Sequence, residues 1–593
     1  PMHRNLGVFT VRDIPLKRLF AQWQGTANGY TKGRDRSFHF GTHDHHIVGM
    51  ISHLGPQNGI ATGIALASRL KNEEKVTAVF NGDGATSEGD FHEAVNLAAV
   101  WDLPVIFIIE NNGYGLSTTN SEQFRCSRLA DKASGYGIEG IRIDGNNILE
   151  VYNTVRGLAQ SLRQHARPVL VECMTFRMRG HEEASGTKYV PSGLLEAWQR
   201  KDPIDNYQAF LLEQNIIDEE LIKSFREKNK REINAAMKAF EEPLAEADPA
   251  DELRDVYAPA PSLPEESEPA SVEFPVRRYI DAISEGLRQS MERFPQLVLM
   301  GQDIAGYGGV FKVTEGLMRQ FGEHRVRNTP LCEAAVVGAG LGLSIGGMKA
   351  MIEMQFADFV TEGFNQIVNN LAKVHWRWGQ SADVVIRMPT GAGTAAGPFH
   401  SQSTESWFFH TPGLKVVYPS NPADAKGLLC AAFEDPNPVL YFEHKFLYRS
   451  LSGHVAPDYY TIGIGKAKVT RKGSDLSIIT YGMGVHWATE IVESMNVDAE
   501  IIDLRTLLPW DKDAVAATVK KTSRVLVLHE DTLTGGIGAE IAAWVAQHCF
   551  NYLDAPVIRV ASLDTPVPFA PPLEQNFLPK GRLRAGIEEL LKF

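Results

Sequence analysis

Two polar motifs follow two apolar runs in the first half of the chain. Gly82-Asp83-Gly84 comes just after the run KVTAVF, and Asn111-Asn112 comes directly after the run PVIFIIE. Runs this rich in Val and Ile predict buried parallel strands. Because the carboxyl ends of such strands meet at the ligand-binding edge of an α/β sheet, we expect Asp83 and Asn112 to lie close together.

These side chains suit a hard cation that bridges to a phosphate. Magnesium takes about six oxygen ligands at about 2.1 Å and often shares phosphate oxygens with its ligand. Asp83, the Asn112 amide and the backbone carbonyl of Tyr114 can supply the protein ligands, and a diphosphate can supply others. Gly82 and Gly84 allow the backbone to approach the phosphates.

The simplest alternative is that this glycine-rich motif is only a strand-to-helix turn. Ser87 and Asp90 resemble the capping pattern of a helix start, and one such motif by itself would favour the turn. The second motif, at the end of the neighbouring predicted strand, favours the metal site.

Glu333, His181 and His400 are further candidates for chemistry. A lone glutamate before a Gly/Ala-rich helix is usually a helix-start charge, and an isolated histidine is usually a hydrogen-bonded structural residue. The residues alone therefore leave both interpretations open.

Two other groups of residues resemble binding motifs, but their patterns do not support a site. The helical segment with Gly338, Gly340 and Gly342 fails the GxGxxG spacing of dinucleotide-binding loops, because Leu343 occupies the last position, and we predict close helix packing there instead. We interpret the members of a histidine cluster as loop and sheet histidines rather than as metal ligands. They are His39, His43, His45 and His46.

Strand-like and helical segments alternate around these residues, which predicts α/β units. In the first half, Gly89–Val100 is a predicted helix between the two strands, and 205–240 is charged and helical. Later strands are predicted at Leu297–Met300, Ala350–Ile352, Val384–Arg387, Lys415–Tyr418, LSIIT from Leu476, Ala499–Leu504 and Arg524–His529.

The segment 241–273 separates the two halves. It is rich in Pro, Ala and Glu, so it cannot bury enough surface to offset its ordering entropy, and we predict a linker. A long surface loop is the alternative, although structureless loops of that length are uncommon inside one domain.

Bulk composition narrows the class of protein. The net charge is −13 without a basic block, which argues against a nucleic-acid partner, and no run approaches the ~20 apolar residues of a membrane span. The 5 cysteines form no CxxC pair, which fits a reducing compartment, and we expect a cytoplasmic protein. The first residue is Pro1 rather than Met, so any targeting segment is left open.

Longer segments resemble one family. The chain is similar to the decarboxylating dehydrogenase component of thiamine-diphosphate-dependent 2-oxo acid dehydrogenase complexes, with alpha-type and beta-type subunits fused across the acidic linker. The similarity runs over nearly the whole chain and is closest to the branched-chain (2-oxoisovalerate) dehydrogenases. The segments that carry it include NGDGATSEGDFHEA, ENNGYGLST, FRMRGHEEASG, RVRNTPLCE, EMQFADF, FHSQSTESWF and HEDTLTGGIGAEI.

The resemblance implies an α/β fold with parallel or mixed sheets. It implies a diphosphate-binding domain at 1–240, a pyrimidine-binding domain at 274–455 and a transketolase-type C-terminal domain at 456–593. It also implies a homodimer with cofactors between domains of partner subunits. The implied partners are a 2-oxo acid substrate and a lipoyl-bearing dihydrolipoyl acyltransferase core.

The resemblance also implies residue roles. Glu333 matches the glutamate that faces the aminopyrimidine ring, where a carboxyl group favours the tautomer that takes a proton from the thiazolium carbon. His181 and His400 match the two catalytic histidines, one from each half. Asp83, Asn112 and the Tyr114 carbonyl match the Mg²⁺ ligands. The implied cofactor contacts are Arg4, Leu54, Gly82, Asp83, Gly84, Ala85, Asn112, Tyr114, His181, Glu333, Gln355 and Phe359.

Several positions depart from the family. A Tyr-Arg pair near the diphosphate is replaced by His3-Arg4; Arg4 can still contact a phosphate, whereas the role of His3 is left open. Mitochondrial relatives have a regulatory serine where Glu182 stands, so we expect no kinase control there. The potassium loop reads Pro56-Gln57 instead of Thr-Gln, whereas Asp435 and Asn437 resemble a second K⁺ site.

Phe359 stands where branched-chain relatives carry Tyr, which leaves pyruvate and branched 2-oxo acids both open. Two rival functions are a transketolase-like transferase, which would need sugar-phosphate-binding residues, and an inactive scaffold subunit. Loss of Asp83 or Glu333 would mark the scaffold, and both residues are present.

Overall fold

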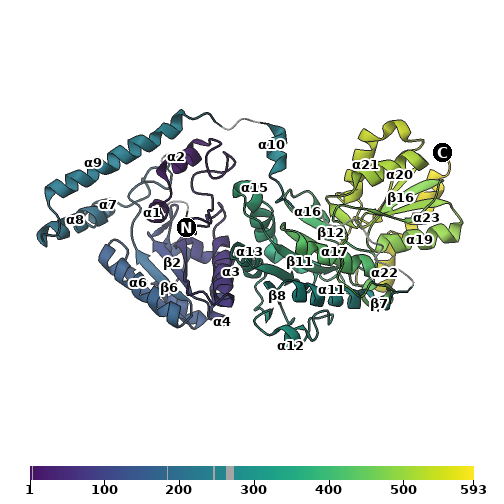
Figure 1. The fold of residues 1–593 in the computed structure, drawn as a ribbon, viewed down its shortest axis with the longest axis horizontal. Coiled ribbons are helices and arrows are strands. Elements are labelled where there is room, and N and C mark those ends of the chain that lie inside the picture. Colours follow the sequence, from purple (N-terminus) through teal and green to yellow (C-terminus); the bar gives the residue numbers. More distant parts are fainter. Residues whose placement is uncertain (3–4, 183, 245–247, 262–272) are drawn as a thin grey trace. The chain divides into compact units, whose positions relative to one another are not determined.

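The computed structural model describes residues 1–2, 5–182, 184–244, 248–261 and 273–593 in two compact units (Figure 1). Unit 1 comprises Pro1–Val256 together with Ala334–Gly346 and Val374–Gln380. Unit 2 comprises Tyr257–Glu333, Gly347–Lys373 and Ser381–Phe593.

Unit 1 is built on a four-stranded parallel sheet in the order β1-β2-β6-β5. Its strands are β1 (Thr77–Gly82), β2 (Val105–Asn111), β5 (Glu139–Asp144) and β6 (Val169–Met174). Val, Ile and Phe side chains fill β2, which is almost fully buried, as expected for a parallel strand covered on both faces. The predicted helix Gly89–Val100 is confirmed as α4 with those bounds.

A helix from the second half of the sequence belongs to unit 1. In α13 (Glu333–Ile345), a Cβ added at Gly342 would lie 2.1 Å from the Ile60 carbonyl oxygen of α3 (Pro56–Leu70). Conversely, a Cβ at Gly63 would lie 2.0 Å from the Ala339 carbonyl oxygen. The two backbones therefore touch, and the prediction of close helix packing at these glycines is confirmed.

The charged region 205–240 is helical as predicted, in α8 (Pro203–Glu213) and α9 (Glu219–Ala236).

The predicted linker differs from expectation, because it contains the helix α10 (Pro249–Arg254). Arg34 Nε lies 3.0 Å from Glu252 Oε2, and its Nη1 lies 2.8 Å from Asp255 Oδ2. Acidic residues of this kind favoured an unstructured linker in the sequence. In the structure, Glu252 and Asp255 attach this part of the segment to the rest of unit 1.

Unit 2 contains a seven-stranded sheet in the order β18-β12-β13-β11-β10-β8-β9. The strands are β8 (Leu297–Gly301), β9 (Val326–Asn328), β10 (Lys349–Glu353), β11 (Val384–Thr390), β12 (Lys415–Val417), β13 (Val439–His444) and β18 (Thr506–Leu508). All pairs are parallel except β12 with β18.

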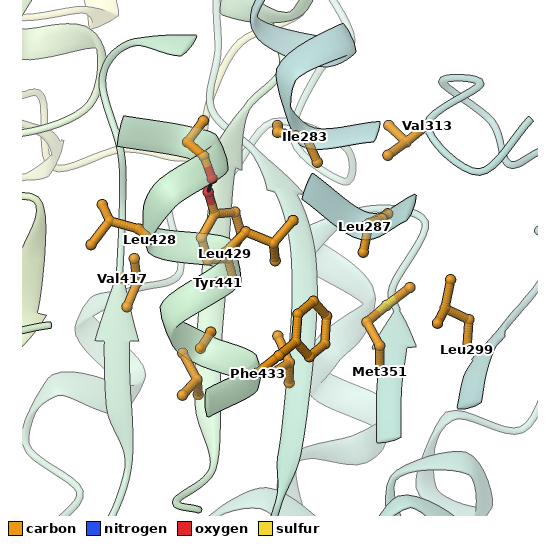
Figure 2. Close-up of a cluster of buried hydrophobic side chains, with 14 of the residues drawn as sticks. Ile283, Leu287, Leu299, Val313, Met351, Val417, Leu428, Leu429, Phe433 and Tyr441 are labelled. Carbon is orange, nitrogen blue, oxygen red and sulfur yellow. Dashed lines mark hydrogen bonds between the residues drawn. The ribbon is translucent and has the colours of Figure 1, made fainter. Parts of the chain in front are cut away.

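The core of this sheet lies beneath two helices, α11 (Tyr279–Arg293) and α17 (Pro422–Glu434) (Figure 2). Leu428, Leu429 and Phe433 of α17 face the strands, and the buried Tyr441 hydroxyl donates to the Ala425 carbonyl at 2.5 Å. Helix and sheet are thus joined by apolar packing, and the buried phenolic hydroxyl of Tyr441 has a hydrogen-bond acceptor.

A second sheet of unit 2 has the order β15-β17-β16-β19-β20. Its strands are β15 (Lys468–Arg471), β16 (Leu476–Thr480), β17 (Ala499–Asp503), β19 (Val525–Thr532) and β20 (Ile558–Ser562). The mixed α/β fold is confirmed, and the predicted strands are found with ends shifted by a few residues. Among the described residues, no helix is long and apolar enough to cross a membrane.

Candidate functional site

Asp83 lies just beyond β1 and is only 2% exposed. Its Oδ1 accepts from the Gly84 N–H at 3.0 Å, whereas its Oδ2 has no hydrogen-bond partner in the described part of the chain. Burial raises the pKa of Asp83, and the N–H groups of Gly84 and Gly113 oppose that rise. A buried carboxylate with one open oxygen is suited to receive a cation.

The end of β2 lies beside Asp83, because Gly82 and Glu110 are paired in the parallel register. The two asparagines of the motif make different contacts. Asn111 is buried and donates from Nδ2 to Glu172 Oε1 at 2.7 Å, and its Oδ1 accepts from the Gly113 N–H at 3.1 Å. Asn112 is half-buried, and its Oδ1 accepts from the Tyr114 N–H at 3.1 Å.

Two segments of backbone lie close together at this edge of the sheet. A Cβ added at Gly84 would lie 3.2 Å from the Gly115 Cα, in the two-residue strand β3 (Tyr114–Gly115). Asp83, Asn112 and Tyr114 lie just beyond the neighbouring strands β1 and β2, and they offer oxygen atoms of the kind that Mg²⁺ prefers. These residues fit a Mg²⁺ ion that shares a diphosphate.

One detail of the expected turn is wrong. Ser87 does not begin α4; residues Gly84–Ser87 form a 3₁₀ turn, and the N-cap of α4 is Glu88, which makes no side-chain cap bond. Ser87 Oγ instead donates to Gln123 Oε1 at 3.2 Å. The acidic residue Asp90 does lie in the first turn of α4.

His181 is half-buried and is approached by an arginine that sequence reasoning missed. Arg177 Nη1 lies 3.4 Å from His181 Nδ1, and Arg177 Nη2 donates to the Leu116 carbonyl and, at 2.9 Å, to the Tyr189 hydroxyl. Arginine can only donate, so Nδ1 is the acceptor in this contact. The motif FRMRGH contained this arginine, but nothing in the spacing identified its partner.

In unit 2, Glu333 is half-buried at the start of α13. Gln302, which follows β8, donates from Nε2 to Glu333 Oε1 at 2.9 Å. The carboxylate is therefore oriented at that oxygen by a neutral amide rather than by a cation.

His400 is half-buried between aromatic rings in unit 2. Its ring centroid lies 4.7 Å from that of Phe356 in an edge-to-face arrangement and 5.5 Å from that of Phe359. Gln355, in the same segment, donates to Asp303 Oδ2 at 3.0 Å. The structure thus brings Phe359 to His400, and Phe356 was not singled out from sequence.

Two other expected cofactor contacts are less informative. Leu54 is half-buried and directly precedes Gly55, the N-cap residue of α3. His3 and Arg4 lie outside the described residues.

The expected second potassium site does not fit the residues there. Asp435 is paired with Lys415 Nζ, and Asn437 Nδ2 donates to Asp435 Oδ1 at 2.8 Å and to the Ala258 carbonyl at 2.9 Å. Asn437 Oδ1 accepts from the Ala258 N–H at 2.7 Å. A lysine ammonium already balances the carboxylate, so a potassium ion has no role to fill at this position.

Comparison with known proteins divides the chain into three matched regions. Residues 1–247 match the family described as Dehydrogenase E1 component. Residues 277–450 match Transketolase, pyrimidine binding domain, and residues 465–582 match Transketolase, C-terminal domain.

Individual relatives match the second half. The chain is 45% identical over 325 residues to 2-oxoisovalerate dehydrogenase subunit beta of Bacillus subtilis (strain 168), covering 54% of this chain and 99% of that protein. It is 46% identical over 319 residues to the mitochondrial 2-oxoisovalerate dehydrogenase subunit beta 2 of Arabidopsis thaliana, covering 53% and 88%. Pyruvate dehydrogenase E1 component subunit beta of Rhizobium meliloti is 38% identical over 316 residues, covering 52% and 69%.

A beta-type subunit is thus matched almost end to end by one half, and an E1-type region precedes it in the same polypeptide. The chain belongs to the thiamine-diphosphate-dependent 2-oxo acid dehydrogenases, with alpha-type and beta-type parts fused.

Proposed function

We propose that the chain decarboxylates a branched-chain 2-oxo acid of the 2-oxoisovalerate type and transfers the acyl group to a lipoyl group on a dihydrolipoyl acyltransferase. The carrying observation is the 45% identity to a 2-oxoisovalerate dehydrogenase beta subunit over 99% of that protein. In this reaction the bond to the carboxylate breaks and carbon dioxide leaves. The lipoyl disulfide is the oxidant: one sulfur takes the acyl group, and the other takes a proton.

Asp83, Asn112 and the Tyr114 carbonyl would hold Mg²⁺ against the diphosphate. The open, buried Oδ2 of Asp83 supports this assignment. When bound, thiamine diphosphate supplies the electron sink for the charge that carbon dioxide leaves behind.

Glu333 would hold a proton at the ring nitrogen of the aminopyrimidine, in the orientation that Gln302 gives its carboxylate. His181 and His400 would move protons at the substrate and at the lipoyl sulfur. We assign the sulfur to His400, by analogy with the family. His400→Ala is then expected to lose mostly lipoamide-dependent turnover and to keep ferricyanide-coupled decarboxylation.

The proposed assembly is a cytoplasmic homodimer that binds a lipoyl-bearing acyltransferase core. Its domains are 1–240, 274–455 and 456–593. Light scattering tests the dimer: the expected mass is twice the 65.5 kDa of one chain.

Steady-state rates with pyruvate, 2-oxoisovalerate and 4-methyl-2-oxopentanoate, with ferricyanide as acceptor, test the substrate class. The expected order places both branched acids above pyruvate in kcat/KM. Phe359 lies beside His400, so its ring is the first candidate for shaping the acyl pocket. A preference for pyruvate would contradict the branched-chain assignment and leave the family unchanged.

A further inference from the structure

The loop 391–405 carries His400 between β11 and the short helix α16 (Ser406–Phe409). Its backbone is left-handed at Gly391, Gly393, Gly397 and even at Ala395, where φ is 51°. L-residues such as alanine rarely adopt this conformation, so the surrounding structure must enforce it.

One side chain from far along the sequence engages this segment. Glu574, in α22 (Pro571–Phe577), is only 4% exposed. Its Oε1 accepts from the Gly393 N–H at 2.9 Å, and the Ala395 N–H lies 3.2 Å from Oε1 and 3.1 Å from Oε2. Hydrogen bonds to a carboxylate are about twice as strong as neutral ones, and here they hold the strained turn directly.

A second carboxylate reinforces the same turn. Glu530 of β19 accepts from the Ala392 N–H at 2.6 Å and lies 2.6 Å from His444 Nε2. Lys445 Nζ donates to the Gly391 carbonyl at 2.6 Å. Ala392 also packs in a small apolar cluster with Val567 and Phe577, so α22 contacts the turn through both polar and apolar groups.

The far end of the loop is fixed separately. The Gln402 N–H donates to Asp358 Oδ1 at 3.2 Å, and Thr390 Oγ1 donates to the Gln402 carbonyl at 3.0 Å. His400 itself meets the Phe356 and Phe359 rings. The loop that carries His400 is therefore held at both ends, and its first part is held from the C-terminal region by Glu574 and Glu530.

We propose that Glu574 is a positioning residue for His400: by binding the Gly393 and Ala395 N–H groups, the C-terminal region sets the loop that serves acyl transfer to the lipoyl group. This inference rests on the proposed function of His400. Within the described part of the chain, the hydrogen bonds of this buried carboxylate go to the Gly393 and Ala395 N–H groups of the loop. Packing of α22 alone would not require a buried carboxylate at this position.

The test compares Glu574→Ala and Glu574→Gln, with Glu500→Gln as the matched control. Glu500 is a 5% exposed carboxylate of β17 in the same region, and it binds Thr518 and Lys521 instead of the loop. We expect Glu574→Ala to lower lipoamide-dependent kcat about 10- to 100-fold, as misplacement by about 1 Å can. The ferricyanide-coupled rate and the KM for the 2-oxo acid should hold. Glu574→Gln keeps one acceptor oxygen and should fall between, which carries the test if the alanine variant does not fold.

The double variant His400→Ala/Glu574→Ala tests whether Glu574 acts through His400. Its lipoamide-dependent kcat should equal that of His400→Ala, because residues that act as a unit are not additive. Multiplying losses, or an equal loss in Glu500→Gln, would overturn the inference.

Hydrogen exchange separates this inference from the proposed function. In the cofactor-free full-length chain, peptides within 391–405 should exchange faster in Glu574→Ala than in Glu500→Gln. If wild-type enzyme shows no lipoamide turnover, the proposed function fails, and exchange alone then decides whether Glu574 holds the loop. Unchanged exchange in 391–405 would overturn the inference that Glu574 holds this loop.

Discussion

Asp83 uses one carboxylate oxygen to hold its own turn and keeps the other open in a buried position. Asp83→Ala should therefore remove Mg²⁺-dependent binding of thiamine diphosphate, measured by calorimetry, and with it the activity. Asp144→Ala is the matched control, because Asp144 ends β5 at the same edge of the sheet but is exposed. Near-normal cofactor affinity in Asp83→Ala would show that the metal assignment is wrong.

Glu333→Gln should leave the cofactor bound and slow proton exchange at the thiazolium carbon. A group that acts in acid–base catalysis typically contributes ~10²–10⁴-fold, so we expect a loss of at least that order. Exchange can be followed by NMR of the quenched cofactor, with calorimetry as the check that binding survives. A loss below about tenfold would be too small for the role assigned here.

Single residues were predictable where the motif itself carried the chemistry. Asp83 and Asn112 were singled out from their position after apolar runs, and the structure brings those strand ends together. The separate role of Asn111 was not visible, because its partner Glu172 is 61 positions away. Likewise, Glu574 contacts Ala395 across 179 positions, and a single sequence contains no signal for such a pair.

At the scale of elements, the contact between α3 and α13 is the most demanding feature of unit 1. Gly63→Ala would place a methyl group 2.0 Å from the Ala339 carbonyl oxygen, which must move the helices apart. Overpacking of this kind costs about 1–3 kcal/mol or more, and the melting temperature should fall. A calorimetric scan checks this.

The control for this helix contact is Gly157→Ala, in the interior of α6 (Ile148–Gln164), where a new Cβ meets no atom within 4 Å. Removing the conformational freedom of this glycine should stabilise α6 by about 0.5–1 kcal/mol. If Gly63→Ala melts no lower than wild type, the backbones do not touch as described.

Strand β19 contains a histidine that should make the protein sensitive to mild acid. Burial lowers the pKa of His529 from 6.5 to about 4, and its ring packs against Gly536 and Gly538. Between these two values the unfolded chain binds a proton that the folded protein excludes, so stability falls as pH falls. The interval corresponds to a loss on the order of 3 kcal/mol.

His529→Gln should flatten the fall of the melting temperature between about pH 6.5 and about pH 4. His548→Gln is the control, because His548 is exposed in the neighbouring helix α21 (Ile537–His548). Equal slopes in wild type and His529→Gln would refute the buried neutral state of this ring.

Elements were predictable to the extent that their apolar pattern is local. Long Val/Ile runs identified the central strands, and α4 was predicted to the residue. The edge strand β18 is three residues long, and it pairs with β12 by tertiary contact rather than by pattern. Helix α10 was missed because charged residues suggest disorder unless partners such as Arg34 are known.

For the whole molecule, linear domain boundaries describe the chain incompletely. The segment Ala334–Gly346, which directly follows Glu333, groups with unit 1 although it comes from the beta-type half. The beta-type half of the sequence thus contributes residues to unit 1, in addition to being joined to the alpha-type half by the linker. Because the two parts are fused, each alpha-type part is made together with one beta-type part. This one-to-one ratio suits the proposed reaction, which uses residues of both parts.

The most direct test of the account is the mass of the lipoyl product. Free lipoamide is incubated with the full-length enzyme, Mg²⁺, thiamine diphosphate and 2-oxoisovalerate, and both released carbon dioxide and modified lipoamide are measured. The account predicts one S-acylated dihydrolipoamide for each carbon dioxide, heavier than lipoamide by the branched acyl group on one sulfur and one hydrogen on the other. Carbon dioxide without acylated lipoamide, or neither product, would contradict it.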